Sequence, residues 1–192
     1  MEAEIPIVDP YRGMGKILPL IPPKLRFSWL FASITWVGKV TVDYEAQLSC
    51  FELKQWFDVV HQVSSLDGSR KLAWSRWGTV PCKGIQTRRY GYVRMKRAML
   101  IPWVRRRILI AGLLPATDLE AVFFSRKFPD EQRTRIILPT GSFFDFYNDQ
   151  RGYALLLGNE RQRGLHFPSC SSYGLDRIKR IREDVDFLVR ER

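Results

Sequence analysis

The spacing of apolar and polar residues along the chain predicts its first two elements. A long strand, or a hairpin broken at Gly38, is predicted by the aromatic and β-branched run FSWLFASITWVGKVTVDYE (27–45). A helix is predicted in SCFELKQWFDVVHQV (49–63), because Ser49 and Glu52 have the spacing of a capping box. Five apolar residues of this segment fall on roughly one helical face: Phe51, Trp56, Phe57, Val60 and Val63.

The rest of the chain predicts mostly strands. A short second helix is predicted in RKLAWSRWG (70–78), which follows a turn. The alternation of apolar and charged residues around residues 90–97 favours a strand that ends before Pro102. We expect further strands in three places: RRRILIAGLLP (105–115) with TDLEAVFFSRKF (117–128), RTRIILP (133–139), and a hairpin of YALLLG (153–158) with GLHFP (164–168).

The C-terminal stretch has the spacing of an amphipathic helix, which we expect over residues 174–190. Its apolar positions are Leu175, Ile178, Ile181, Val185 and Leu188. Several strands with a few helices define an α+β fold. With 192 residues, the chain is expected to form a single compact domain over residues 24–192, mainly an antiparallel sheet packed with a few helices.

Residues 1–23 differ from the rest, because five prolines favour an extended segment that pairs little with other strands. We interpret this segment as an N-terminal arm. It also carries apolar side chains that need a surface to cover them: Ile17, Leu18, Leu20 and Ile21. The arm can dock on a neighbouring subunit or lie on its own core, and the sequence leaves both open.

Composition adds a strong charge imbalance, with 31 Lys and Arg against 20 Asp and Glu. A formal charge of +11 indicates an anionic partner, such as nucleic acid, acidic lipid or an acidic protein. The longest charge-free apolar run, residues 27–38, is too short to span a bilayer as a helix, and the acidic N-terminus does not resemble a signal peptide. Cys50, Cys82 and Cys170 are far apart, so we expect free thiols.

Motifs for catalysis and metal binding are scarce. His61 and His166 are the only histidines, and both are interpreted as structural or boundary residues. The chain has no closely spaced Cys or His ligands for zinc, no P-loop and no Gly-x-Ser-x-Gly motif. We therefore expect a non-enzymatic protein with no catalytic residues, metal or cofactor.

The strongest functional signal is RRYGYVRMKRAMLIPWVRRR (88–107), which contains eight cations and no acid. The cations are Arg88, Arg89, Arg94, Lys96, Arg97, Arg105, Arg106 and Arg107. They would add affinity for the phosphates of lipid or RNA, and the interspersed aromatic residues could stack on bases or lie at a lipid interface. The alternative is a solvated strand edge whose charges keep neighbouring chains away.

Five segments in one order also resemble a known family: LRFSWLFASITW (25–36), FELKQWFDVV (51–60), GYVRMKRAMLIPWVRR (91–106), GLLPATDLEAVFF (112–124) and FFDFYNDQRGYALLLG (143–158). They are similar, in turn, to the first core strand, first helix, basic strand, Gly-Leu strand and last-hairpin block of the matrix proteins of rhabdoviruses, which are enveloped negative-strand RNA viruses. The resemblance covers about residues 25–167. Many animal-virus members carry a Pro-Pro-x-Tyr budding motif in the arm, where this chain has only DPYRG (9–13) and IPPKL (21–25).

This resemblance implies a structural protein that self-associates, condenses the helical nucleocapsid and attaches it to the inner face of an anionic membrane during virion assembly. The implied partners are further copies of the chain, the viral nucleoprotein–RNA complex and the anionic membrane surface, with the viral glycoprotein as a further candidate. The implied locations are the virion beneath its envelope, the host cytoplasm and the inner face of host membranes, with the nucleus as a further candidate. Two interpretations stay open: an RNA-binding viral accessory protein, such as a silencing suppressor or movement factor, and an enzyme with an unrecognised site.

Removal of residues 1–23 distinguishes the two positions of the arm. We expect the arm to dock on a neighbouring subunit through Ile17, Leu18, Leu20 and Ile21. The truncated protein should then stay folded and soluble but no longer assemble, because it has lost the head-to-tail contact that builds an open lattice. Light scattering at low salt reports assembly, and the melting temperature reports folding. A lower melting temperature with unchanged assembly would place the arm on its own core instead.

Overall fold

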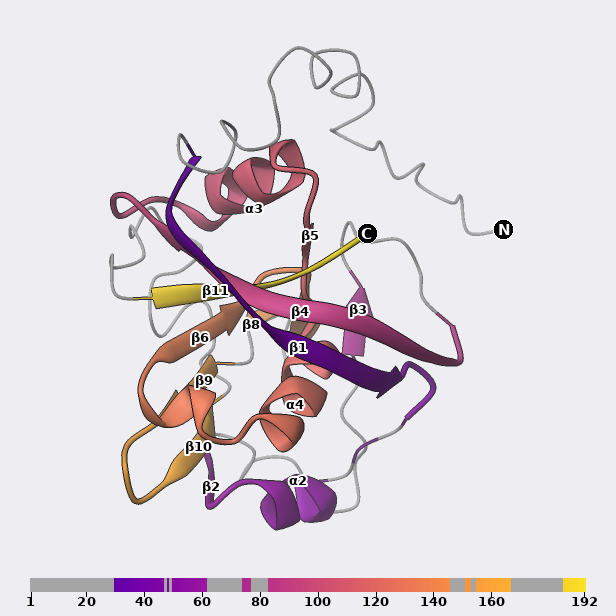
Figure 1. Cartoon of the computed structure of the whole chain (residues 1–192). Coiled ribbons are helices and arrows are strands. Elements are labelled where there is room, and N and C mark those ends of the chain that lie inside the picture. The colour runs from indigo at the N-terminus through magenta and orange to yellow at the C-terminus, as the bar shows by residue number, and fades with distance from the viewer. Residues whose placement is uncertain are drawn as a thin grey trace.

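A mixed eight-stranded sheet forms the centre of the molecule (Figure 1). Its strand order in this computed structural model is β1-β4-β11-β6-β9-β10-β2, and β5 pairs with β11 beside that path. The β11–β6 and β10–β2 pairs are parallel and the other pairs of this sheet are antiparallel, which confirms the α+β prediction with a mainly antiparallel sheet. The structure describes residues 30–46, 48, 50–61, 74–76, 83–145, 151–152, 155–166 and 185–192.

The strands of the large sheet are β1 (Phe31–Asp43), β2 (Val59–His61), β4 (Ile85–Met95), β5 (Leu114–Pro115), β6 (Ile136–Pro139), β9 (Leu155–Gly158), β10 (Arg163–His166) and β11 (Val185–Arg190). A second sheet joins β3 (Trp74–Arg76), β7 (Ser142–Asp145) and β8 (Arg151–Gly152). The helices are α2 (Cys50–Trp56), α3 (Ile101–Ile110), α4 (Asp118–Lys127) and the 3-10 turn η3 (Glu131–Arg133).

The two faces of the sheet have separate cores. On one face, Val93 of β4 and Phe187 of β11 are paired neighbours that pack with Val104 of α3. On the other face, Tyr90 of β4 and Leu188 of β11 pack with α4 and α2. Figure 1 accordingly shows α3 and α4 on opposite sides of the β1–β4 pair. The sheet is therefore the middle layer of the domain.

One buried carboxylate connects the sheet to α4. Glu120 is fully buried, and its Oε1 lies 2.8 Å from Nε of Arg190 on β11, which is 3% exposed. The same oxygen accepts hydrogen bonds from the Tyr90 hydroxyl at 3.0 Å and from the Tyr44 hydroxyl. Oε2 accepts the Thr117 N–H at 2.6 Å, which completes a capping box at the start of α4. A buried charge is tolerated when several donors surround it in this way.

The sequence patterns at α3 and α4 were misleading, because both segments were expected to be strands. In α3 the buried residues Ile101, Val104, Arg105 and Ile108 have helical spacing, and a proline occupies the first turn. Helix α4 is buried on nearly every side, so its apolar run shows no amphipathic period. The segment 112–124, which resembles a strand of the matrix family, is therefore helical over residues 118–124 here.

The predicted helix over residues 174–190 is wrong at residues 185–190, which form β11; residues 174–184 lie outside the described part. This strand lies between β4 and β6 and is buried on both faces, so it shows no alternation. Asp186 and Arg190 look like the polar face of a helix in the sequence, yet both are buried and paired with opposite charges.

Shorter corrections concern the elements around α2 and β3. The first helix ends at Trp56, since Val59 and Val60 instead form β2 and pair in parallel with β10. Residues 74–76, expected in a helix, pair with β7 as β3. The long strand at residues 31–43, the strand at residues 136–139 and the hairpin of β9 and β10 are confirmed.

Stability at alkaline pH should depend on Tyr44 and Tyr90. Burial, followed by the charge of Glu120, raises the pKa of both hydroxyls well above 10. Below pH 10 both folded and unfolded chains keep these protons; above it only the unfolded chain loses them, so stability falls. Between pH 9 and 11 we expect the wild type to lose about 3 kcal/mol more unfolding free energy than Tyr44→Phe/Tyr90→Phe, because each unfolded tyrosine contributes a little over about 1 kcal/mol. Urea unfolding at both pH values measures this, and equal losses would contradict it.

Candidate anion-binding site

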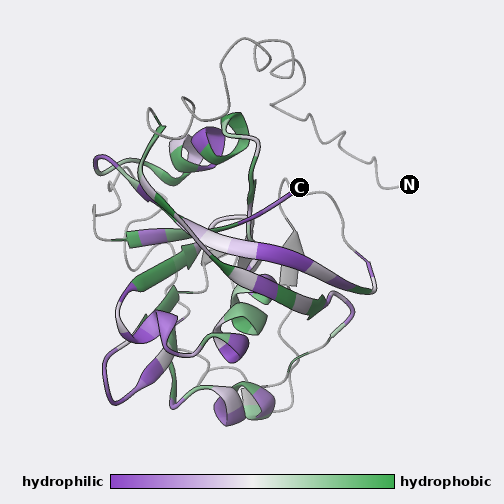
Figure 2. Ribbon diagram, in the orientation of Figure 1, coloured by the Kyte–Doolittle hydropathy of each residue, from purple (hydrophilic) through white to green (hydrophobic). Residues whose placement is uncertain are grey.

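The eight cations of residues 88–107 are distributed over one strand, one helix and the connection between them. Arg88, Arg89 and Arg94 lie on β4, Lys96 and Arg97 lie on the connection, and α3 carries Arg105, Arg106 and Arg107. Figure 2 shows the hydrophilic colour of these residues interrupting the apolar ribbon at the connection and in the middle of α3. The structure therefore turns one basic stretch into several different environments.

Arg94 binds an acid inside the protein. Its Nε and Nη2 donate to the two carboxylate oxygens of Asp186 at 2.8 Å each, and the Asp186 side chain is 1% exposed. Arg135 reaches the same carboxylate at 3.3 Å and lies over the Tyr92 ring at 4.2 Å. Burial raises the pKa of Tyr92 to about 12, and its hydrogen bond to Glu131 acts in the same direction. Arg94 is thus mainly a structural residue.

Arg105 and Arg107 are also partly used by the fold. Arg105 is 6% exposed, because it shares the buried face of α3 with Val104 and Ile108. Arg107 is half-buried and donates from Nη1 to the Leu30 carbonyl oxygen at 3.0 Å. The structure therefore does not present Arg105 to a flat anionic surface, and it holds Arg107 by its guanidinium.

Two cations near the start of β4 have local partners. Arg89 is exposed, forms a 3.2 Å ion pair with Glu191 and lies over the Trp36 ring at 4.8 Å. Arg88 is half-buried and donates to Gln86 Oε1 at 3.2 Å. Exposed ion pairs are weak, so an external anion could compete for Arg89 at small cost.

The remaining three cations, Lys96, Arg97 and Arg106, are exposed around the connection between β4 and α3, and we call them the rim cations. Trp103 is 53% exposed beside them, and the guanidinium carbon of Arg106 lies 5.4 Å from its ring centre. Tryptophan is enriched at interfaces where one end of the ring is apolar and the other is wet, and a guanidinium over its face is attracted by the ring.

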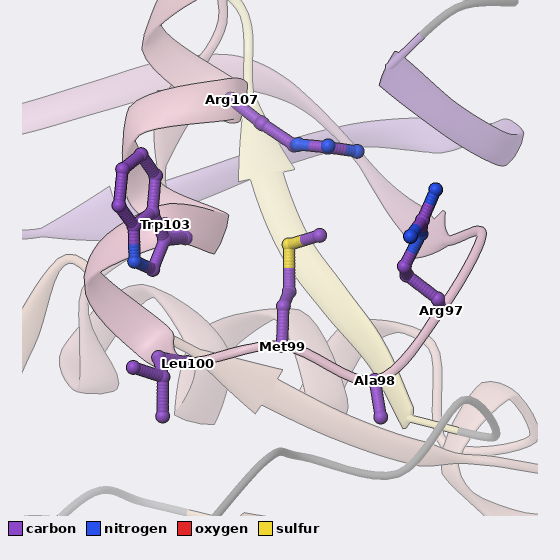
Figure 3. Close-up of a pocket in the computed structure, with 6 residues that line it drawn as sticks. All are labelled: Arg97, Ala98, Met99, Leu100, Trp103 and Arg107. Atoms are coloured by element: carbon purple, nitrogen blue, oxygen red, sulfur yellow. The ribbon is translucent and has the colours of Figure 1, made fainter. Parts of the chain in front are cut away.

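A pocket of about 300 Å³ opens at the same connection and is lined by Arg97, Ala98, Met99, Leu100, Trp103 and Arg107. Figure 3 shows the ends of Arg97 and Arg107 pointing toward one another above Met99, with Trp103 on the far side of the pocket. Trp103 and Arg107 are one helical turn apart, so α3 places both at the opening. The sequence did not predict that Trp103 and Arg107 lie together, because residues 105–115 were expected to form a strand.

A second pocket, of about 150 Å³, adjoins β10 and is lined by His166, Asn159, Gln162 and four apolar or glycine residues: Val59, Leu157, Gly158 and Gly164. Neither of these two pockets combines two acid–base side chains of the kind a general acid–base mechanism uses. In the described part of the chain, no three His, Cys, Asp or Glu residues are grouped for metal binding. No helix among the described residues is long and apolar enough to cross a membrane.

Some predicted features lie outside the described residues. These are the arm with Ile17, Leu18, Leu20 and Ile21, together with Cys82 and Cys170; the side chain of Cys50 is likewise not described. No protein-family model, curated protein or solved structure matches the chain. The similarity to rhabdovirus matrix proteins therefore stays a prediction.

Two arginines three positions apart should behave differently when replaced. Arg94→Met removes two charge-assisted hydrogen bonds from the buried Asp186, so we expect a loss of about 2 kcal/mol in unfolding free energy. Arg97→Met alters an exposed side chain and should change stability by less than about 0.5 kcal/mol. Urea unfolding of both variants measures the difference. Equal stabilities would mean that the Arg94 pair contributes little.

Proposed function

We propose that this chain is a non-enzymatic viral matrix protein. It self-associates, condenses a helical nucleoprotein–RNA complex and attaches it to the inner face of an anionic membrane during virion assembly. The resemblance in sequence order supports the viral assignment. The arrangement around Trp103 supports the attachment to an anionic surface, and it is the observation on which the proposal depends most.

The rim cations supply the charge for this attachment. All three are exposed, and Trp103 stands half-exposed among them. Each Lys or Arg near an acidic bilayer contributes about 1 kcal/mol, so three give about 3 kcal/mol, which is weak and reversible for one subunit. Self-association would present many copies together, and avidity would make the attachment of the assembly firm.

An RNA-binding accessory protein is the second candidate, and exposed Trp103 is the observation that favours it, because a base could stack on the indole ring. The two candidates differ in how particle size responds to salt. A matrix protein should form large assemblies at low salt that dissociate at high salt. An accessory protein should stay small at every salt concentration and bind naked RNA tightly at low salt.

Replacing the rim cations should selectively weaken membrane binding. For Lys96→Gln/Arg97→Gln/Arg106→Gln we expect about 100-fold weaker partition onto acidic vesicles, from the loss of three contacts at about 1 kcal/mol each. The matched control is Lys39→Gln/Lys54→Gln/Arg161→Gln, which removes three exposed cations from β1, α2 and the β9–β10 turn. It should lose less than about tenfold, because only long-range attraction changes. Vesicle flotation measures both.

Two results would count against the proposal. Equal losses in the two triple variants would show that net charge, rather than this surface, drives attachment. Equal binding of the wild type to neutral and acidic vesicles would remove the electrostatic basis altogether.

A further inference from the structure

We infer that the pocket at the connection from β4 to α3 binds the phosphomonoester headgroup of an acidic lipid, held between Arg97 and Arg107. The inference rests on the proposed function, because it names the ligand that the same surface would select on a membrane. It goes further in assigning a specific recognition of phosphate chemistry, whereas attachment by the rim cations alone would respond to any negative charge.

The two guanidinium groups form the polar end of the pocket. Arg107 extends from α3 and Arg97 from the connection after β4, and their ends converge above the Met99 side chain (Figure 3). Arg107 is held in place by its hydrogen bond to the Leu30 carbonyl oxygen at 3.0 Å. One partner is therefore fixed before a ligand arrives, which lowers the entropy cost of binding.

The charge and geometry of a phosphomonoester match this pair. At neutral pH such a group carries a charge between about −1.5 and −2 and presents three acceptor oxygens. Guanidinium groups bind phosphate through two parallel N–H donors and stay protonated at any physiological pH. A phosphodiester carries a single charge and only two unsubstituted oxygens, so it cannot serve two arginines equally well.

The size and position of the pocket fit a single headgroup. Its volume of about 300 Å³ is at the small end of the range for ligand pockets. Leu100 and Trp103, both lining residues, belong to the cap and first turn of α3, where Leu100 provides no side-chain cap.

The walls favour a lipid over RNA. Trp103 is 53% exposed, and Leu100 and Met99 are partly exposed beside it, so apolar groups would meet the region just below the headgroups. Internal RNA phosphates are diesters, and single-stranded RNA is usually held by several stacking residues. In the described part of the chain, Trp103 is the one aromatic residue beside these cations that is more than half exposed.

The test compares two kinds of vesicle with the full-length chain. One contains phosphatidic acid, a phosphomonoester, and the other phosphatidylglycerol, a phosphodiester, with lipid fractions adjusted to equal zeta potential. We expect about tenfold tighter binding to phosphatidic acid, measured by flotation, which corresponds to about one added charge-assisted hydrogen-bonded pair. Inorganic phosphate at the same total phosphate concentration should displace little protein, because it offers nothing to Trp103 and Leu100.

Variants at two neighbouring positions distinguish specific recognition of the phosphomonoester from general attraction by positive charge. Arg97→Lys keeps the positive charge but loses the bidentate guanidinium. This variant should therefore bind phosphatidylglycerol vesicles like the wild type and lose most of the preference for phosphatidic acid over phosphatidylglycerol. Lys96→Gln removes one charge just outside the pocket, so it should weaken binding to both vesicles by the same factor and keep the preference. Loss of the preference in Lys96→Gln but not in Arg97→Lys would overturn the assignment.

The outcomes for the wild type separate this inference from the proposed function. Equal binding to both vesicles would overturn the phosphomonoester site and leave charge-driven attachment standing. Binding to neither would overturn both. Complete displacement by inorganic phosphate would show that the pocket takes soluble phosphate, and would overturn the lipid assignment alone.

Discussion

The buried carboxylate of Glu120 is the interaction on which the arrangement of the fold depends. A charge with no exposure to water must be compensated inside the protein. Glu120 accepts hydrogen bonds from the Thr117 N–H at the cap of its helix and from the Tyr44 and Tyr90 hydroxyls, and it forms an ion pair with Arg190. Tyr44 directly follows β1, Tyr90 lies within β4, and Arg190 is the last residue of β11. The carboxylate can be satisfied only when these elements and α4 come together, so it favours one sheet order over its alternatives.

The position of β11 in the middle of the sheet also determines which basic residues face solvent. Asp186, which is buried on this strand, pairs with the half-buried Arg94, and Glu191, just after the strand, pairs with Arg89 at the surface. The rim cations lie on the connection and on the outer side of α3, beyond the reach of these acids. The rim cations are thus the part of the basic stretch that the fold has not used for its own stability, and they are fewer than the charge count suggests.

Local signals were present in several segments that we expected to adopt another conformation. Thr117 and Glu120 have capping-box spacing, and Pro102 suits a first helical turn, yet both helices were expected to be strands. Continuous apolar runs such as AVFF (121–124) do not distinguish a buried helix from a buried strand. At the C-terminus, Asp186 and Arg190 have the spacing of polar residues on one face of a helix. Their burial could not be predicted locally, because the residues that pair with them are far away in the sequence.

The sequence by itself determined the fold class, the long first strand, the hairpin of β9 and β10 and the location of the basic stretch, since composition and short-range periodicity carry these features. Only the tertiary structure decided which cations are buried, which pair with acids and which remain at the surface. It also brought Arg97 and Arg107 together over Met99 at one pocket. The physical reason is that pairing and burial depend on residues distant in the chain, such as Asp186 for Arg94 and Leu30 for Arg107, and no local pattern encodes those contacts.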